Sequence, residues 1–556
     1  MPPIHQHINQ NLIMANAFFR VPEPKNEPVL SYAKGSPERK ALKAQLAAFK
    51  ASEIDIPMII GGKEIRSENK VAIRPPHEIK HVLGYYHKGN ESHVKMAIDA
   101  ALSAREAWEN TSWEHRAAVF LKAAELLAGP YRQKLNAATM LGQSKNAYQA
   151  EIDAACELID FFRYNAYYMQ QIYQDQPISS PTVWNRMEYR GLEGFVLAIT
   201  PFNFTSICAN LCSAPAQMGN VIVWKPANTQ VYSAKVIMDL FKESGLPDGV
   251  INLVFAEGAV IGNTCFAHPE FAGLHFTGST STFQRMWRTI AENMPNYRYY
   301  PRIVGETGGK DYVVAYPDAH AKAVAVALSR GAFEYQGQKC SAASRAYIPS
   351  SLWPDVKKYL LEDLADMKMG NPEDFTNFVN AVIDEKAFDS IVKYIDGAKN
   401  ASGTQIIAGG NYSKTEGYFI EPTVIQVESP YYLTMCEEIF GPVLTIHVFE
   451  DEKFWETMDA LDKASPYALT GAIFAQDRQV IETLANRLRH TAGNFYINDK
   501  PTGAVVGQQP FGGGRASGTN DKAGSYLNLI RWTSPRAIKE NFLPPTDYRY
   551  PFLEEA

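Results

Sequence analysis

Phe195-Val-Leu-Ala-Ile-Thr200 and Val221-Ile-Val-Trp224 are two short β-rich runs separated by a helical stretch. The same alternation continues to residue 304, with further β-rich runs at Ile251–Phe255, Leu274–Phe276 and Ile303–Val304. Its clearest helical stretch covers residues 233–243 and ends at Gly245. Strands that alternate with helices at this spacing predict a parallel sheet with helices on both faces.

A second alternating series between residues 311 and 498 predicts a second α/β domain. Its β-rich runs are Tyr312–Ala315, Arg345–Ile348, Gln405–Ala408, Val443–Phe449, Leu469–Phe474 and Asn494–Ile497. We expect the first domain to comprise residues 26–181 and 191–306 and the second to comprise residues 307–515, joined near Gly305–Lys310. Residues 182–190 are interpreted as an inserted strand, and residues 516–550, which include Tyr526–Glu540, as a tail.

Three helix starts can be placed before the first series. Ser36-Pro37-Glu38 combines a capping residue with a proline in the first turn. A second helix is expected from Ser92, where apolar residues recur at spacings of three and four. A third is expected from Ser112 to Gly129.

The composition argues against a nucleic-acid-binding or membrane protein. The chain has 556 residues, of which 46% are hydrophobic and 21% charged, and its net charge is −6. That charge is too small to predict attraction to nucleic acid or to an anionic membrane. No apolar run approaches the roughly 20 residues needed to span a bilayer.

Cysteine usage predicts a reducing compartment. The 6 cysteines include no C-x-x-C pair, and so few in a long chain do not make a disulfide framework. The expected location is the cytoplasm, with the mitochondrial matrix as the alternative. Arg20 is the only fixed cation among the first twenty residues, so a transit peptide has little support. Met14 is an alternative start that would make residues 1–13 an unstructured extension.

One stretch matches the full H-E-x-x-H-x-x-G-x-x-H pattern of zinc peptidases: His77-Glu78-Ile79-Lys80-His81, followed by Gly84 and His87. On a helix these histidines could bind zinc. Prolines precede the stretch, however, and its end is β-rich. In an extended chain His77 and His81 would be about 13 Å apart. We therefore expect a loop leading into a strand and no metal, with a zinc peptidase as the alternative from another class.

The candidate chemistry is carried, in chain order, by Asn203, Glu306, Cys340 and Glu438. Lys339 and helix N-terminal amides would favour a Cys340 thiolate, and Asn203 follows a strand at the sheet edge where ligands collect. Taken singly, each also fits a structural role: a buried thiol, a linker turn or a turn asparagine. Together, a base, a thiol nucleophile and a cofactor-pocket acid suggest covalent aldehyde oxidation with a nicotinamide cofactor, although no G-x-G-x-x-G occurs.

Longer stretches make the chain resemble the aldehyde dehydrogenase superfamily over nearly its whole length from about Asn26. They are Phe276–Phe283, Phe333–Ala342, Gly493–Lys500, Thr502–Gly512 and Arg515–Asp521. They are similar to the branch that oxidises L-glutamate γ-semialdehyde, formed from Δ1-pyrroline-5-carboxylate, to L-glutamate in proline catabolism. The resemblance implies an aldehyde-dehydrogenase-like α/β fold: a Rossmann-type NAD-binding domain, a catalytic domain, and an oligomerisation flap made of residues 182–190 and 516–550.

The resemblance implies that the reaction passes through a thioester on Cys340. Asn203 and the Cys340 backbone N–H would hold the oxyanion, and Glu306 would activate the water that releases the acid. Because Glu306 directs the thioester to water, an enzyme that transfers the acyl group to coenzyme A is disfavoured. A dehydrogenase acting on another semialdehyde is the alternative within the superfamily.

The implied NAD site draws on both domains. Lys225 and Glu438 would hydrogen-bond the two riboses, and Phe440 would pack near the nicotinamide. Ser279 would bind the pyrophosphate at a helix N-terminus, with Thr200 in the same site.

The implied substrate site recognises the carboxylate, the aliphatic chain and the ammonium of an amino acid aldehyde. In that order its residues are Ser341, Gly503 and Ala504 with Lys339 assisting; Phe204 and Phe511; and Glu157. The resemblance also implies a homodimer or a larger homo-oligomer that assembles through the flap.

Overall fold

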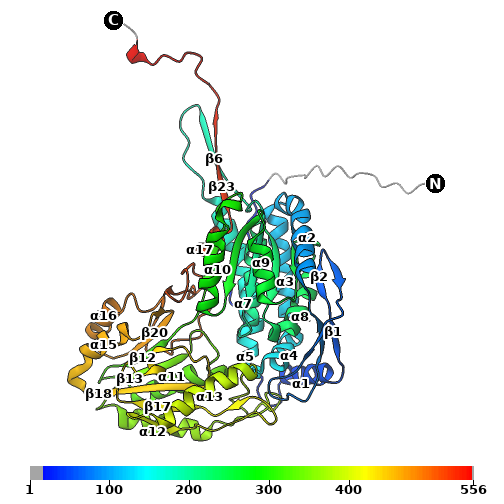
Figure 1. The fold of residues 1–556 in the computed structure, drawn as a ribbon. Coiled ribbons are helices and arrows are strands. Elements are labelled where there is room, and N and C mark those ends of the chain that lie inside the picture. The colour runs from blue at the N-terminus through cyan, green and yellow to red at the C-terminus, as the bar shows by residue number, and fades with distance from the viewer. Residues whose placement is uncertain (1–16, 554–556) are drawn as a thin grey trace.

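The computed structural model describes residues 17–553. The extension expected at residues 1–13 and the alternative start at Met14 lie outside these residues. Two seven-stranded sheets, each packed against helices, make up most of the molecule (Figure 1). Within the described part of the chain, none of the helices combines the length and apolar character needed to cross a membrane.

The first sheet has the order β11-β10-β7-β8-β9-β2-β3. Its five strands from β11 to β9 are parallel, whereas β2 and β3 add antiparallel pairings at the far edge. The strands are β11 (Arg302–Glu306), β10 (Phe271–Thr277), β7 (Phe195–Thr200), β8 (Val221–Pro226), β9 (Ile251–Leu253), β2 (Met58–Ile60) and β3 (Lys63–Ile65).

Two groups of helices pack against this sheet, and both contact β8. One group contains α2 (Glu91–Glu109) and α9 (Gly258–Phe266), next to α10 (Thr280–Glu292). The other contains α3 (Trp113–Ala128), α4 (Arg132–Gln143), α6 (Glu157–Gln174), α7 (Thr205–Gln217) and α8 (Val231–Ser244). The chain enters this second group through α1 (Pro37–Lys50), and the short α5 (Ala147–Ala150) and a π-helical turn, Glu151–Cys156, connect α4 to α6.

Local sequence explains where these helices begin and end. Ser36 caps α1 through Arg39 N, with a proline in the first turn, and Ser112 caps α3. Gly245 ends α8 with a left-handed φ of 92°, a conformation that suits glycine. The helix expected from Ser92 begins one residue earlier, because Asn90 provides the cap.

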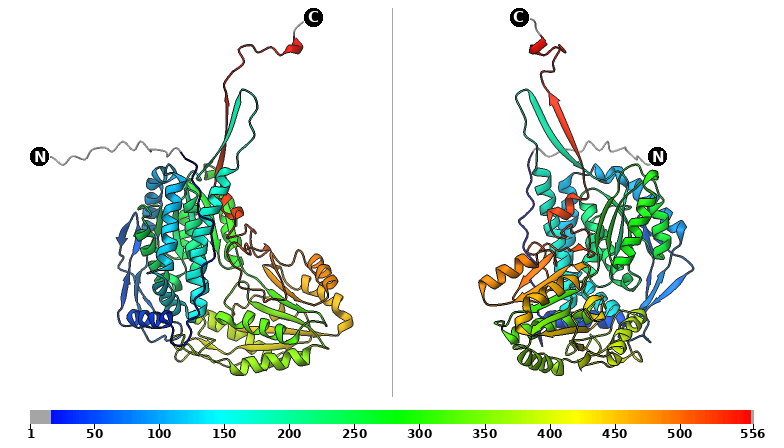
Figure 2. Two further views of the ribbon diagram at one scale, coloured as in Figure 1. Left: turned by 180° about the vertical axis from the view of Figure 1, so that it is seen from behind. Right: turned by 60° about the vertical axis from the view of Figure 1, so that its left-hand side comes forward.

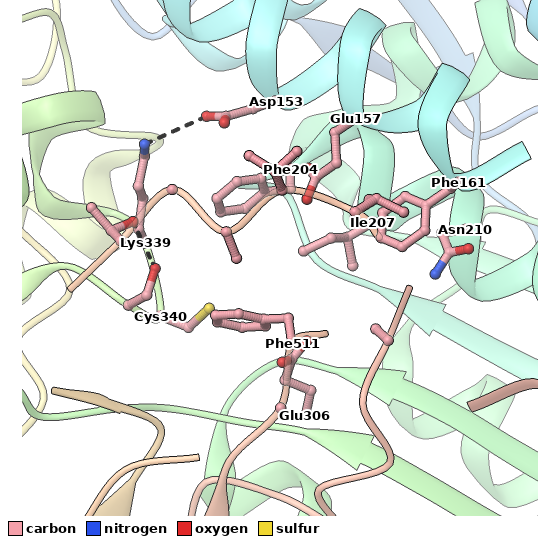
Figure 3. A pocket seen from close by; sticks show the side chains of 18 of the residues that line it. Asp153, Glu157, Phe161, Phe204, Ile207, Asn210, Glu306, Lys339, Cys340 and Phe511 are labelled. Atoms are coloured by element: carbon pink, nitrogen blue, oxygen red, sulfur yellow. Dashed lines mark hydrogen bonds and ion pairs between the residues drawn. The ribbon is translucent and has the colours of Figure 1, made fainter. Parts of the chain in front are cut away.

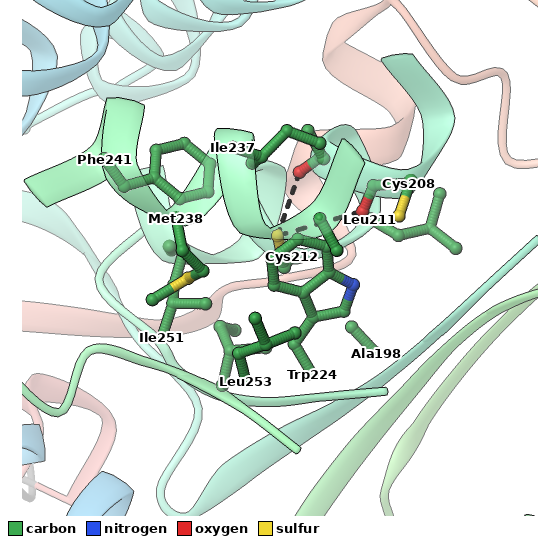
Figure 4. Close-up of a cluster of buried hydrophobic side chains, with 14 of the residues drawn as sticks. Ala198, Cys208, Leu211, Cys212, Trp224, Ile237, Met238, Phe241, Ile251 and Leu253 are labelled. Carbon is green, nitrogen blue, oxygen red and sulfur yellow. Dashed lines mark hydrogen bonds between the residues drawn. The ribbon is translucent and has the colours of Figure 1, made fainter. Parts of the chain in front are cut away.

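Apolar side chains from α7, α8 and the central strands form the core beside the first sheet (Figure 4). Trp224 is fully buried there, and its indole N–H donates to Thr200 Oγ1 at 3.1 Å. Burying a large apolar side chain contributes roughly 1.5–3 kcal/mol. This core therefore fixes the ends of β7 and β8 that face the site.

The second sheet has the order β14-β17-β18-β13-β12-β20-β21, parallel except for the β14–β17 pair. The strands are β14 (Thr404–Ala408), β17 (Thr423–Val427), β18 (Val443–Phe449), β13 (Ala343–Pro349), β12 (Asp311–Ala315), β20 (Thr470–Phe474) and β21 (Asn494–Ile497). One buried cluster joins the sheet to α11 (Ala321–Phe333) and α12 (Trp353–Asp366). Another joins it to α13 (Glu385–Asn400), α14 (Leu433–Cys436), α15 (Phe454–Lys463) and α16 (Arg478–Arg487).

A two-stranded ribbon extends away from the rest of the molecule (Figures 1 and 2). It pairs β6 (Val183–Arg190) with β23 (Ser534–Asn541) in antiparallel register, from Val183 opposite Asn541 to Arg190 opposite Ser534. The helix α17 (Tyr526–Ile530) precedes β23. The inserted strand and the C-terminal tail therefore lie side by side.

Three smaller sheets complete the fold. They are β1 (Ile54–Ile56) with β5 (Gly84–His87) and β4 (Lys70–Ile73); β15 (Tyr412–Ser413) with β16 (Phe419–Ile420); and β19 (Tyr467–Ala468) with β22 (Gly514–Arg515). The pairing of β19 with β22 brings residues 514–515 against residues 467–468, directly before β20 of the second sheet.

Candidate active site

A cavity of about 660 Å³ lies where the two sheet-containing parts of the chain meet. Every residue expected to bind substrate lines it, together with Cys340 and Glu306 (Figure 3). Asn203, Thr200, Lys225, Ser279, Glu438 and Phe440 do not line this cavity. The residues expected for substrate and for cofactor thus occupy separate places.

Cys340 is held by a strained loop that follows α11. Tyr335 and Gln336 have left-handed φ values of 50° and 54°, which cost of order 1–3 kcal/mol each outside glycine. The Tyr335 hydroxyl donates to Gln143 O at 2.9 Å, and the Gln336 side chain donates to Ala381 O at 2.8 Å. These buried contacts hold the loop in a conformation it would not adopt alone.

Lys339, expected to favour a Cys340 thiolate, has carboxylate partners of its own. Lys339 Nζ lies 3.4 Å from a carboxylate oxygen of Glu334 and 3.7 Å from one of Asp153, so its charge is already paired. No α-helix begins at Cys340 either. Burial, followed by the charge of Glu306, raises the pKa of the Cys340 thiol well above its ordinary value. The thiol therefore needs a base to take its proton.

Glu306 ends β11, directly opposite Thr277 at the end of β10. Its Oε1 is buried and has no hydrogen-bond partner among residues 17–553. Burial raises the pKa of Glu306 to about 8, with Lys522 acting in the opposite direction. A carboxylate with a pKa near neutrality and an unused oxygen is suited to general base catalysis.

Asn203 joins the two parts of the chain beside the thiol. Its side-chain amide is buried and donates to Gln338 O at 3.1 Å, in the loop that carries Cys340. That bond uses one of the two N–H groups of the amide. The other can donate to an oxyanion.

Two residues expected to bind cofactor lie on strand β8 and at the start of helix α10, and both places have hydrogen-bond donors that are not used within the described residues. Lys225 Nζ forms no hydrogen bond or ion pair within the described residues. Burial lowers the pKa of Lys225. Ser279 is the N-cap of α10, and its side chain forms no capping bond. An unpaired ammonium and uncapped helix amides fit the riboses and pyrophosphate of a dinucleotide. The Thr200 hydroxyl already contacts Trp224 and Cys208.

Glu438 and Phe440 face this region from the second sheet. Glu438 Oε1 accepts from Gly309 N at 3.0 Å, and burial raises the pKa of Glu438 to about 7. A Cβ on Gly308 would lie 2.2 Å from Glu438 Oε2, so the glycine allows the carboxylate to approach. Phe440 has a φ of 58°, and its ring packs edge-on against Phe202 at 5.9 Å.

The fold brings three hydrogen-bond donors from distant parts of the chain to one end of the cavity. The backbone N–H groups of Gly503 and Ala504 have no partner among residues 17–553. Ser341 Oγ lies 2.8 Å from Thr502 Oγ1, which brings the Ser341 hydroxyl to the same loop. Free amides beside a hydroxyl are suited to a carboxylate.

A cluster of buried charged side chains lies beside the cavity. The sequence indicated Lys339 and Glu157 but not Lys145 and Asp153. Lys145 Nζ contacts Asp153 Oδ2 at 2.5 Å and lies 4.5 Å from the centre of the Phe204 ring. Asp153 belongs to the π-helical turn, which has no sequence signal and often marks functional sites. Burial, then Asp153, raises the pKa of Glu157 to about 8. A substrate ammonium nearby would favour its ionised form.

The zinc-like stretch is a loop of turns that leads into β5. His77 Nδ1 lies 3.1 Å from Ser144 Oγ, whereas His87 contacts Asp55 and the Ser67 carbonyl. Within residues 17–553, no group of three or more His, Cys, Asp or Glu side chains is placed to hold a metal ion. The histidines therefore have separate structural contacts.

Comparison with known proteins extends these observations to the whole chain. Residues 65–537 match the aldehyde dehydrogenase family. Mitochondrial Δ1-pyrroline-5-carboxylate dehydrogenase of Dictyostelium discoideum is 51% identical over 98% of this chain and 99% of that protein. The human mitochondrial enzyme of the same name is 46% identical over 95% of this chain and 94% of its own length.

The structure of Δ1-pyrroline-5-carboxylate dehydrogenase from Mycobacterium tuberculosis superposes with a TM-score of 0.94 at 50% identity, covering 98% of this chain and 100% of that one. A second structure of that enzyme, bound with NAD, has the same TM-score and covers 97% of this chain. The family match, the identities and the shared fold agree over nearly the full length. The chain belongs to the aldehyde dehydrogenase family.

Proposed function

We propose that the chain oxidises L-glutamate γ-semialdehyde to L-glutamate and transfers the hydride to NAD. The observation that carries this proposal is the cavity itself, which places the Cys340 thiol and the Glu306 carboxyl in the same space as the free N–H groups of Gly503 and Ala504. The names of the relatives support it, because Δ1-pyrroline-5-carboxylate is the cyclic form of this semialdehyde.

The proposed chemistry assigns each step to one side chain. The Cys340 thiol passes its proton to water and its sulfur attacks the aldehyde carbon, while Asn203 and the Cys340 N–H stabilise the oxyanion. NAD, held by Lys225, Ser279 and Glu438, supplies the hydride acceptor. Loss of hydride from the carbon leaves a thioester, and Glu306 takes a proton from the water that cleaves it.

Substrate selection rests on the charged ends of the semialdehyde. The carboxylate would accept from Ser341 and the two loop amides, and Phe204 and Phe511 would enclose the chain. Glu157 would meet the ammonium. Lys339 attracts the substrate carboxylate more weakly, because its charge is already paired with Asp153 and Glu334.

We also propose that the ribbon of β6 and β23 joins copies of the chain into a homodimer or a larger assembly. Trp184, on this ribbon, is 48% exposed. For the compartment, the relatives from D. discoideum and human are named as mitochondrial. That supports the mitochondrial matrix over the cytoplasm.

The deciding experiment follows NADH formation with Δ1-pyrroline-5-carboxylate and with a panel of plain aldehydes. Strong preference for the first substrate is expected. Equal efficiency across the panel would reduce the assignment to an aldehyde dehydrogenase without this specificity.

A further inference from the structure

Residues 20–34, here called the N-terminal strap, cross the helices that form one wall of the cavity (Figure 2). Glu27 receives hydrogen bonds from Arg132 at 2.6 Å and from Arg163 at 2.7 Å. Leu30 N donates to Glu151 Oε1 at 2.9 Å. Both carboxylates are more than half buried, so these charged contacts fix the strap firmly on α4, the π-helical turn and α6.

Asn26 reaches from the strap to both walls of the cavity. Its amide nitrogen donates to Asp160 Oδ2 and to the Val506 carbonyl, each at 2.8 Å. Its amide oxygen accepts from Gln508 Nε2 at 2.9 Å and from the Tyr164 hydroxyl at 3.4 Å. Both ends of the amide are thus used, and the contacts define which end is nitrogen.

The loop that Asn26 grips is the one that presents the free amides. Gly503 and Ala504 lie three and two residues before Val506, respectively, and Asn26 itself lines the cavity. The loop contains Gly507, whose φ is 81° and whose missing Cβ would lie 2.1 Å from the Tyr164 ring. The loop therefore packs directly on α6 at Gly507. On either side of that glycine, Val506 and Gln508 are held by Asn26.

We propose that Asn26 is a positioning residue for substrate specificity, which aligns the Gly503 and Ala504 amides with the carboxylate of an amino acid aldehyde. This inference rests on the proposed function. Donors must be held within a fraction of an ångström of their acceptors to contribute to binding. Asn26 fixes the loop that carries these amides against α6, and its side-chain hydrogen bonds go to neither the thiol nor the residues expected to bind cofactor.

The test uses two variants of the full chain and one control. Asn26→Ala removes all four contacts, and the isosteric Asn26→Asp places a carboxylate against Asp160 and the Val506 carbonyl. Lys25→Ala changes an exposed neighbour on the same strap. Steady-state constants are measured for the semialdehyde and for pentanal. Binding of the product glutamate to the enzyme without NAD is measured by calorimetry.

We expect both Asn26 variants to raise KM for the semialdehyde and Kd for glutamate by about tenfold, the effect of losing a well-formed hydrogen bond or two. The values of kcat and the constants for pentanal should stay near those of the wild type. In Lys25→Ala, the kinetic constants for both aldehydes and the Kd for glutamate should also stay near wild type. A change in KM and Kd without a change in kcat or in the pentanal constants would show that Asn26 aligns the carboxylate-binding amides. General damage to the fold would change all of these constants.

Two results would overturn the inference. One is an unchanged KM for the semialdehyde in both variants. The other is an equal loss for both aldehydes together with a lower melting temperature, which would make Asn26 a structural residue only. If the wild-type enzyme itself fails to prefer the semialdehyde, the proposed function fails instead.

Discussion

The Glu306 carboxyl is buried, and its Oε1 has no hydrogen-bond partner among residues 17–553. A base acts only when deprotonated, and burial raises the pKa of Glu306 to about 8. Thioester hydrolysis is therefore expected to rise with pH through that value and then level off. In Glu306→Gln this rise should disappear, and rapid mixing should show a burst of NADH followed by a slow steady rate. Slowed hydride transfer with no burst would give Glu306 another role.

Cys340 provides a second test at the scale of one residue. Replacing the thiol in Cys340→Ala should abolish aldehyde oxidation, because no thioester can form, while NAD binding measured by fluorescence titration persists. Cys436→Ala is the matched control, since Cys436 lies outside the cavity and should leave oxidation unchanged. Near-normal oxidation by Cys340→Ala would exclude covalent catalysis through this thiol.

At the scale of elements, two strands buried on both faces were predicted to the residue, whereas only residues 274–276 of the equally buried β10 were predicted. The run at Phe195–Thr200 coincides with β7, and that at Val443–Phe449 with β18, because central parallel strands are continuously apolar. The strand β17, which lies inside the second sheet between β14 and β18, and the antiparallel edge formed by β2 and β3 were not predicted. Strands of only 3 to 5 residues carry a short pattern, and their pairing depends on distant residues.

The ribbon of β6 and β23 yields a prediction of its own. Ending the chain after Thr533 removes β23, which pairs with β6 along its whole length, and a lone strand does not persist in water. We expect this truncation to lower the mass measured by light scattering to that of a single chain. Ending the chain after Leu543 keeps β23 intact and is expected to preserve the wild-type mass. Identical masses for both truncations would place the contact between copies elsewhere.

For the whole molecule, the sequence motifs indicated candidate site residues but not the charged partners that surround them in the fold. Motifs located Cys340 and Glu306, which the fold brings to one cavity. They could not show that Lys339 pairs with Asp153 and Glu334, nor that Lys145 joins that cluster. Such pairings are set by tertiary packing between residues far apart in the sequence.

Specificity is the prediction that depends on the whole cavity. Pentanal has the chain length of the semialdehyde without its charges, so it would leave the anchor donors unpaired, at about 1–3 kcal/mol each. We expect its kcat/KM to be at least about a hundredfold lower, equivalent to roughly 2.7 kcal/mol. Glutamate should inhibit competitively against the semialdehyde. Similar kcat/KM values for the two aldehydes would contradict the carboxylate anchor.

The hydrogen bond between Asn26 and Val506 joins residues 480 positions apart. A chain emerges from the ribosome with its N-terminus first, at about 5–20 residues per second. Asn26 is therefore made roughly 24–96 s before its partner. Until then the strap can dock only on the helices beside it, and the cavity has no second wall. A nascent chain that is released early cannot complete this contact, so substrate recognition is assembled only when nearly all of the protein has been translated.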